Sequence, residues 1–310
     1  MNKKSGLLAD PSIHPRLPDW LRKPHGLSGS YRSVVRTLSG NATAYPPGKS
    51  VHTVCVEARC PNRAECFSAG TATFLIMGNA CTRECRFCHV HHGSPEPLDR
   101  EEPARVAATA AALNLRHIVI TSVTRDDLTD GGACHIAETV LSCRCMLPDA
   151  TVEVLIPDFG GNESALSAVL SAQPDIVGHN LETVPRLYAA VRPQAAYRQS
   201  LLLLDRARKT VVTKAGLMVG LGETDEEIEA VLADLIAVGC SMVTIGQYLR
   251  PSPAQAEVVR YVTPEQFSRY ESIGRALGFP ALAAGPFVRS SFHALELFQA
   301  AGAAPSPCPA

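Results

Sequence analysis

Residues 71–278 repeat one pattern, a short apolar run followed by a helical pattern, and this alternation restricts the fold more than any other feature. The apolar runs are expected to be strands, and they lie at residues 73–77, 117–123, 151–157, 175–182, 213–222 and 242–249. The helical patterns lie at residues 101–115, 132–146, 162–172, 183–210 (broken at Pro193), 224–239 and 263–278. Apolar strands joined by helical crossovers are typical of a parallel sheet buried on both faces. Six such units predict either an open doubly wound sheet or a partial barrel, and periodicity alone does not choose between these two folds.

Local signals support the expected helix starts. Asn162 stands where an N-cap residue is expected, and Thr224 with Glu227 has the spacing of a capping box. In barrels of this kind the active site lies at the carboxyl ends of the strands. Residues that follow an apolar run directly are therefore the first candidates for function.

Three cysteines follow the first apolar run in the stretch "NACTRECRFCHV", and they are Cys81, Cys85 and Cys88. A chain with this cysteine content would show a given three-cysteine spacing by chance only ~0.01 times. A closed zinc site needs a fourth ligand, which the histidines at positions 89, 91 and 92 could supply. A [4Fe–4S] cluster held by three thiolates would instead keep one iron open for a substrate or cofactor.

A second cysteine triplet lies just upstream, at Cys55, Cys60 and Cys66, so the two triplets contain six of the eleven cysteines. No secretion signal is recognisable, and cytosolic thiols stay reduced, so metal or redox chemistry explains these cysteines better than disulfides do. The other five are expected to have no part in the chemistry. Four of them are expected to pack in the core, namely Cys134, Cys143, Cys145 and Cys240. Cys308 is expected to be exposed.

The bulk composition excludes several classes of partner. The formal net charge is -1, so no basic field would attract nucleic acid through its phosphates. No apolar stretch reaches the roughly 18 residues of a membrane-spanning helix, and we expect a cytoplasmic protein with no membrane partner.

The C-x3-C-x2-C spacing after a first strand resembles the radical S-adenosylmethionine (SAM) superfamily. The upstream C-x4-C-x5-C spacing, together with Arg289, Ser290 and Ser291, makes the chain similar to the lipoyl synthase family. Other segments that resemble this family extend over roughly residues 50 to 293, among them "TSVTRDDLTDGGA", "EVLIPDF", "HNLETVPRLY", "TKAGLMVGLGET" and "TIGQYLRPS". Departures are small: Phe292 replaces a usual tyrosine, a histidine is missing before Val258, and "VGHNLET" replaces an aromatic-Asn lead.

This resemblance implies a fold and a set of cofactors. The fold would be a partial (β/α)6 barrel at residues 71–282, with an N-terminal extension at 1–70 and a C-terminal segment at 283–310. Two [4Fe–4S] clusters and SAM would be bound. Cys81, Cys85 and Cys88 would hold the catalytic cluster. An auxiliary cluster would have four ligands, namely Cys55, Cys60, Cys66 and Ser291, with Ser290 as the alternative to the last.

The activity implied by the resemblance is sulfur insertion at C6 and C8 of a protein-bound octanoyl group, with the auxiliary cluster as sulfur donor. The enzyme would be a transferase, and its partners would be an octanoylated lipoyl-carrier protein or lipoyl domain and an electron donor protein. Two rival functions stay open. One is a dual-cluster methylthiotransferase, and the other is a non-catalytic iron–sulfur or zinc protein, which would need a fourth ligand at the Cys81 triplet.

Four further residues lie at the ends of the fourth and fifth expected strands, and they are Asn180, Glu182, Gly220 and Gly222. Because the carboxyl ends of the strands form the rim that carries the active site, these residues are candidates for contact with SAM. The first pair could equally make hydrogen bonds within the rim. The glycines could simply form a strand-to-helix turn. Arg125 and Asp126 follow the second strand, and they could either pair with each other or bind a ligand.

Overall fold

Seven parallel strands and one short antiparallel strand form a single curved sheet in the order β1-β2-β5-β6-β7-β8-β9-β10. The computed structural model describes residues 17–22, 51–57, 60 and 62–303. The strands are β1 (His52–Thr53), β2 (Thr71–Ile76), β5 (His117–Ser122), β6 (Thr151–Leu155), β7 (Ile176–Gly178), β8 (Val212–Val219), β9 (Met242–Gln247) and β10 (Ala281–Gly285). Within the described residues no ladder joins β1 to β10, so the barrel is open, and the predicted partial barrel is confirmed.

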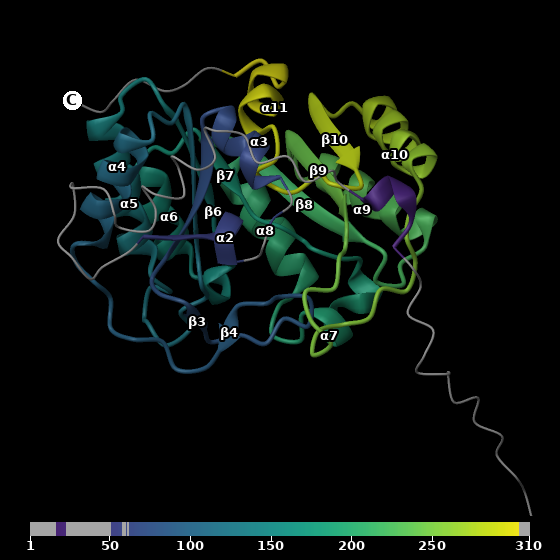
Figure 1. Ribbon diagram of the computed structural model, residues 1–310, viewed down its shortest axis with the longest axis horizontal. Helices are drawn as coiled ribbons and strands as arrows, with labels where there is room; N and C mark the ends of the chain where they lie inside the picture. Colours follow the sequence, from purple (N-terminus) through teal and green to yellow (C-terminus); the bar gives the residue numbers. More distant parts are fainter. Residues whose placement is uncertain (1–16, 23–50, 58–59, 61, 304–310) are drawn as a thin grey trace, which may run out of the picture.

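Helices cover the outer face of this sheet and provide the six predicted crossovers. They are α4 (Glu102–Ala112), α5 (Ala133–Met146), α6 (Glu163–Ser171), α7 (Tyr188–Val191), α8 (Tyr197–Ala207), α9 (Asp225–Ala237) and α10 (Pro264–Leu277). Helices α4, α5 and α6 lie over one half of the sheet, and α9 and α10 lie over the other half (Figure 1). The helices of the described ranges include none that is long and apolar enough to cross a membrane.

The remaining elements are short and lie in the connections after the strands or in the segments before β2 and after β10. They are η1 (Asp19–Leu21), α2 (Val54–Glu57), α3 (Arg63–Ser68), β3 (Ala80–Cys81), β4 (His91–His92), η2 (Phe159–Gly161), η3 (Pro185–Leu187) and α11 (Ala294–Ala300). Most of the predicted N-terminal extension, and Cys308, lie outside the described residues. The division of the chain at residues 70 and 282 stays a prediction.

The structure corrects several predicted boundaries. The strand predicted at 175–182 contains only Ile176–Gly178, and the one predicted at 213–222 ends at Val219. The second ends there because Gly220 has a φ of 105°, which leaves the extended region. Strand β10 was not predicted at all, since its sequence "ALAAG" lacks the β-branched and aromatic residues that mark strands.

Helix α11 closes the amino end of the barrel interior. Its side chains Leu297 and Phe298 pack in one buried cluster with Ile176, Met242 and Ala281. These three residues are the first residues of β7, β9 and β10. The interior is therefore filled at the amino ends of the strands, and the carboxyl ends are left for the site.

A buried ionic network lies beside this cluster, because Glu153 pairs with Ile176 and Lys214 pairs with Met242 in the sheet. Lys214 on β8 donates hydrogen bonds to both carboxylate oxygens of Glu153 on β6, at 2.9 and 3.0 Å. His117 Nε2 lies 3.1 Å from the same carboxylate. Burial opposes ionisation of Glu153, but the charges of Lys214 and His117 outweigh it, so the pKa of Glu153 lies below its ordinary value.

Two predicted helix caps are present. Asn162 Oδ1 accepts a hydrogen bond from the backbone N–H of Ala165, and Thr224 with Glu227 forms both bonds of a capping box. Thr224→Ala should lower the free energy of unfolding by about 1 kcal/mol, because it removes the acceptor for an N–H of the first turn of α9. Urea unfolding of the anaerobically prepared protein measures this. Ser268→Ala, an exposed change in α10, should stay within about 0.5 kcal/mol of the wild type. Equal losses in both variants would contradict the capping argument.

Candidate active site

The three-cysteine loop lies at the carboxyl edge of the barrel, directly after β2. Ala80 and Cys81 form β3, which pairs in parallel with β4 at His91 and His92. Figure 1 shows β3, β4 and α7 along the same lower edge of the molecule. The loop is therefore where the sequence placed it, at the end of the barrel that carries active sites.

Hydrogen bonds to its backbone tie this loop to segments from the far half of the barrel. Arg86 donates its N–H to Val191 O at 2.9 Å, and it accepts from the Ala256 N–H at 2.7 Å. Gln255 Nε2 donates to Cys88 O at 3.1 Å. The segments after β7 and after β9 thus hold the loop across the mouth of the barrel, and the positions of its thiols depend on both.

Arg83, inside the loop, anchors it to the neighbouring strand ends. Its guanidinium binds Asp126 with two hydrogen bonds of 2.8 Å and Asp158 with one of 2.7 Å. Arg125, which could have paired with Asp126, instead binds Asp127. Arg125 and Asp126, for which pairing with each other and ligand binding both stayed open, are therefore engaged with other residues, and sequence reasoning missed Arg83.

The thiols of the loop are in the partly buried setting that a cluster requires. Cys81 Sγ accepts hydrogen bonds from the backbone N–H groups of Arg83, at 3.5 Å, and Thr124, at 3.3 Å. Burial raises the pKa of Cys85, and it raises the pKa of Cys88 to about 12. Iron binding at these residues would therefore release protons. Backbone donors to cysteine sulfur and restricted solvent access are features that tune iron–sulfur clusters, so the donor set fits a [4Fe–4S] cluster.

The neighbouring histidines do not join the thiols. His89 and His91 are exposed, and His92 Nδ1 lies 2.7 Å from Arg83 O. In the described part of the chain, no three His, Cys, Asp or Glu side chains converge as ligands of a single metal ion. The thiolates of a [4Fe–4S] cluster bind separate iron atoms, so they need not converge in this way.

Asn180 and Glu182 lie beside the loop, after β7. Asn180 Nδ2 donates to Glu182 Oε1 at 3.0 Å, and Glu182 has a φ of 65°. Burial raises the pKa of Glu182, and the Arg192 guanidinium partly counters this effect. The charges of Arg192 and Glu182 both act on the Cys85 thiol. A carboxyl group held in this way favours a cation at the site, because a positive ligand would stabilise its ionised form.

The turn after β8 has a structural explanation. Glu223 accepts the N–H of Gly220 at 2.6 Å and that of Leu221 at 2.9 Å. A Cβ on Gly220 would lie 2.3 Å from Gln247 Nε2 and 2.6 Å from Arg260 O. Gly220 therefore lacks room for a side chain whether or not SAM contacts it. A Cβ on Gly222 would meet only Val259 Cγ2, at 3.6 Å, so this glycine faces more open space.

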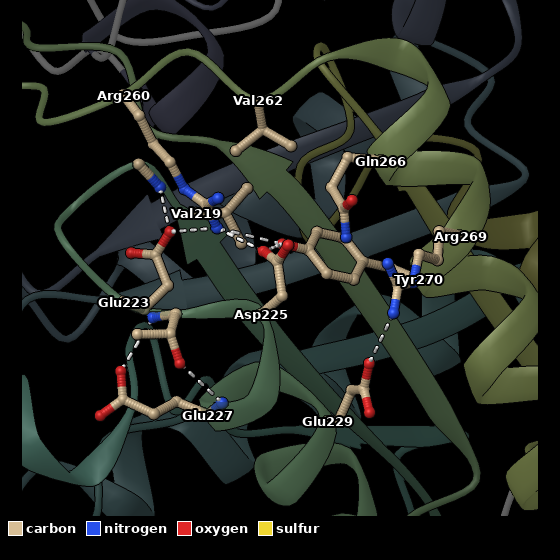
Figure 2. Close-up of polar contacts among 12 residues, drawn as sticks. Val219, Glu223, Asp225, Glu227, Glu229, Arg260, Val262, Gln266, Arg269 and Tyr270 are labelled. Carbon is tan, nitrogen blue, oxygen red and sulfur yellow. Dashed lines mark hydrogen bonds and ion pairs between the residues drawn. The ribbon is translucent and has the colours of Figure 1, made fainter.

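Arg260 fastens the segment after β9 close to this turn. Its guanidinium lies 2.6 Å from Asp225 Oδ1, which also accepts a hydrogen bond of 2.7 Å from the Tyr270 hydroxyl. Figure 2 shows Arg260, Asp225 and Tyr270 pointing toward one another, with Glu223 beside Arg260. The segment that reaches Cys88 through Gln255 is thus fixed at its other end by α9 and α10.

The upstream cysteines lie close together near β2. Cys55 lies in α2 and Cys66 in α3, and the Cys60 N–H donates to Cys55 O at 3.2 Å. Cys55 is only 6% exposed, and burial raises its pKa although the polar groups of Thr73 partly counter this effect. Helices α2 and α3, which carry Cys55 and Cys66, thus both lie beside β2, and this second set of cysteines is separate in the chain from the loop at the rim.

The C-terminal segment 286–293 contacts Asn62 and Glu65, which lie in the chain between Cys60 and Cys66. Asn62 Nδ2 donates to Phe287 O at 2.5 Å, and His293 Nε2 lies 3.0 Å from Glu65 Oε1. Ser290 and Ser291 lie in the chain between these two contacts, and α11 lies beside α3 (Figure 1). Burial lowers the pKa of Arg289, and a Cys60 thiolate would raise it, so Arg289 is within electrostatic reach of Cys60.

Gly246 makes room for this segment on β9. A Cβ at Gly246 would lie 2.1 Å from Val288 O and 3.1 Å from Arg289 Nη1. The glycine therefore lets the C-terminal backbone lie directly on the inner face of the sheet. Sequence reasoning missed Gly246, because a single glycine in a strand does not indicate which segment of the chain will pack on it.

The remaining cysteines follow the predictions only in part. Cys143 and Cys240 are buried, as predicted. Cys134 and Cys145 are exposed, so the prediction that they pack in the core is wrong. They lie eleven positions apart in α5, which is three helical turns, and so they share its outward face.

Comparison with known proteins agrees with this site. The family model of the radical SAM superfamily matches residues 75–235. Among solved structures, methylornithine synthase has a TM-score of 0.53 at 15% identity, over 74% of this chain and 69% of that one. Streptococcus suis SuiB bound to S-adenosylmethionine has a TM-score of 0.51 at 10% identity, over 67% and 49% of the two chains. The structural likeness supports the fold, and the superfamily match implies a [4Fe–4S] cluster and SAM as cofactors.

Sequence relatives narrow the assignment further. A lipoyl synthase from Caldanaerobacter subterraneus subsp. tengcongensis is 54% identical over 90% of this chain and 96% of its own length. Lipoyl synthases from Nitratidesulfovibrio vulgaris strain Hildenborough and Chlorobaculum tepidum are 52% and 51% identical over 94% and 91% of this chain, and 95% of each relative is covered. Identity at this level over at least nine tenths of the chain shows that the chain belongs to the lipoyl synthase family within the radical SAM superfamily.

Proposed function

We propose that this enzyme is a lipoyl synthase that inserts sulfur at C6 and C8 of an octanoyl group on a lipoyl-carrier protein or lipoyl domain. The observation that carries the proposal is the presence of two separate cysteine groups on one barrel. One lies at the rim after β2, and the other lies in the segment around α2 and α3 that Asn62 and Glu65 join to segment 286–293. The second group is what a sulfur-inserting enzyme needs in addition to a radical SAM site.

The roles of the residues follow from their positions. Cys81, Cys85 and Cys88 would hold the catalytic cluster. The ligands proposed for the auxiliary cluster are Cys55, Cys60, Cys66 and Ser291, with Ser290 as the alternative to the serine. When bound, the two clusters and SAM supply the radical that removes hydrogen from C6 and C8 and the sulfur that replaces it. An electron donor protein would supply the reducing electrons, and the cytoplasmic location stays a prediction.

The chain's own residues orient and shield this chemistry. Asn180, Glu182, Gly220 and Gly222 are proposed to contact SAM at the carboxyl edge of the barrel. The buried carboxyl of Glu182 suits a positively charged group of that cofactor. The plug formed by α11 excludes water from the amino end of the barrel, which protects a reactive radical from side reactions.

The proposal predicts different losses for the two cysteine groups. Anaerobically reconstituted wild-type protein should contain about eight iron and about eight sulfide per chain, which correspond to two [4Fe–4S] clusters. Cys66→Ala should lower both to about four. The variant should still cleave SAM but should form no lipoyl group, because the sulfur source is lost. Mass spectrometry of an octanoylated lipoyl domain and chromatography of 5′-deoxyadenosine measure the two activities.

Two outcomes would refute the proposal. One is a wild-type protein that cleaves SAM but leaves the octanoyl group unchanged in mass. The other is a Cys66→Ala variant that still forms lipoyl groups. Cys145→Ala, an exposed cysteine change in α5, is the matched control and should keep both activities.

A further inference from the structure

Arg83 is a buried cation that the proposed reaction does not use directly. Arg83 is 8% exposed. Its guanidinium binds both Asp126, in the segment after β5, and Asp158, in the segment after β6. Burial opposes ionisation of Asp158, but the hydrogen bonds and charge of Arg83 hold its pKa below the ordinary value. The network therefore carries real charges, in a place where they interact strongly.

The same residue reaches the cluster loop through its backbone. The Arg83 N–H donates to Cys81 Sγ at 3.5 Å, and the Arg83 carbonyl lies 2.7 Å from His92 Nδ1. Arg83 thus joins the loop to three surrounding segments. Its charge also acts on Cys85, whose thiolate it stabilises together with Arg192.

We propose that Arg83 is a positioning residue for the cluster held by Cys81, Cys85 and Cys88. Its guanidinium, which binds with two or more N–H groups as a fork, fixes the cysteine loop to Asp126 and Asp158. The buried charge of the guanidinium sets the reduction potential of the cluster. This inference rests on the proposed function only in requiring a cluster at these cysteines. It does not depend on the identity of the substrate.

The charges give the proposal a direction. Reduction adds an electron to the cluster, so a nearby positive charge favours the reduced form. Arg83→Gln removes a positive charge and should shift the midpoint potential to a more negative value. Asp158→Asn removes a negative charge and should shift it to a more positive value. Arg83→Lys keeps the charge but loses the two-point fork, so the potential should stay close to the wild-type value.

The rate of iron loss tests separately whether the guanidinium of Arg83 holds the cysteine loop in place. Arg83→Gln and Arg83→Lys should both lose iron to a chelator about ten times faster than the wild type, since residues around metal ligands typically change affinity by about 10–100-fold. Arg144→Gln is the matched control, because Arg144 is also a buried arginine, 3.2 Å from Asp175, which precedes β7 at the amino end of the barrel. This control should change neither quantity.

The experiment is a potentiometric titration of each anaerobically reconstituted full-length variant. The readout is the electron paramagnetic resonance signal that changes on addition of SAM, which identifies the cluster at the rim. Opposite potential shifts in Arg83→Gln and Asp158→Asn, with rapid iron loss in both Arg83 variants, would support the proposal. Unchanged potentials, shifts of the same sign, or an equal shift in Arg144→Gln would overturn it.

Folding is checked by thermal unfolding of every variant. If Arg83→Gln does not fold, the other two variants still test the proposal. Asp158→Asn must raise the midpoint potential, and Arg83→Lys must leave it close to the wild-type value. Formation of lipoyl groups by the wild type is measured separately. A failure of the proposed function would therefore leave this test readable, since it needs only a cluster that responds to SAM.

Discussion

Cys88→Ala should abolish the reductive cleavage of SAM, with a loss of about a thousandfold or more, because the cluster rather than a side chain carries this chemistry. The thiol is buried at the barrel mouth, and its backbone carbonyl is held by Gln255. No other described cysteine lies in this loop except its partners Cys81 and Cys85. The 5′-deoxyadenosine formed under anaerobic reducing conditions measures the effect.

Cys134→Ala provides the control for this prediction. Cys134 is exposed on α5 and has no proposed part in cluster binding. The variant should therefore cleave SAM at the wild-type rate. Cleavage that survives in Cys88→Ala at more than a few per cent would show that the three-cysteine loop does not hold the catalytic cluster.

Gly246→Ala should separate the two halves of the reaction. Its Cβ would lie 2.1 Å from the backbone oxygen of Val288, so segment 286–293 must move away from β9. Such a movement would disturb the proposed serine ligand, while the cysteine loop at the rim would stay intact. We expect lipoyl formation to fall about a hundredfold, comparable to the loss of a residue that orients a metal ligand, and SAM cleavage to continue.

A second interior glycine tests whether the effect is specific. A Cβ at Gly178 on β7 would lie 3.4 Å from its nearest neighbours, Leu155 Cδ1 and Val154 O, which is close to ordinary contact. Gly178→Ala should therefore keep both activities within about threefold, in line with the small effects of substitutions that fit. Wild-type lipoyl formation in Gly246→Ala, or an equal loss in Gly178→Ala, would contradict the steric argument.

The helices and strands that repeat a strong pattern were predicted well. The apolar runs at 117–123 and 242–249 became β5 and β9, and the capping box at Thr224 begins α9 as expected. Strand β10 was missed because alanine and glycine carry no strand signal. Its place is instead determined by parallel pairing with β9, from Ala281 opposite Met242 to Gly285 opposite Gly246.

The candidate site was predictable only where the chemistry is local. The spacing of Cys81, Cys85 and Cys88 is visible within eight residues, and so is its position after a strand. The partners of Arg83 are 43 and 75 residues away, and nothing in the local sequence identifies them. Arg125 and Asp126 illustrate the same difficulty, since adjacent opposite charges left open a mutual pair that the fold does not make.

By itself the sequence determined the class of fold and the two groups of thiols, because periodicity and cysteine spacing depend on neighbouring residues. Only the tertiary structure decided that Asn62 meets Phe287, 225 positions away, and that Arg83 joins three segments of the rim. The physical reason is that such contacts depend on how β strands align around the barrel. Gly246 contributes to this arrangement because it has no side chain, which leaves room for the backbone of Val288. The local sequence does not show which segment will occupy that room.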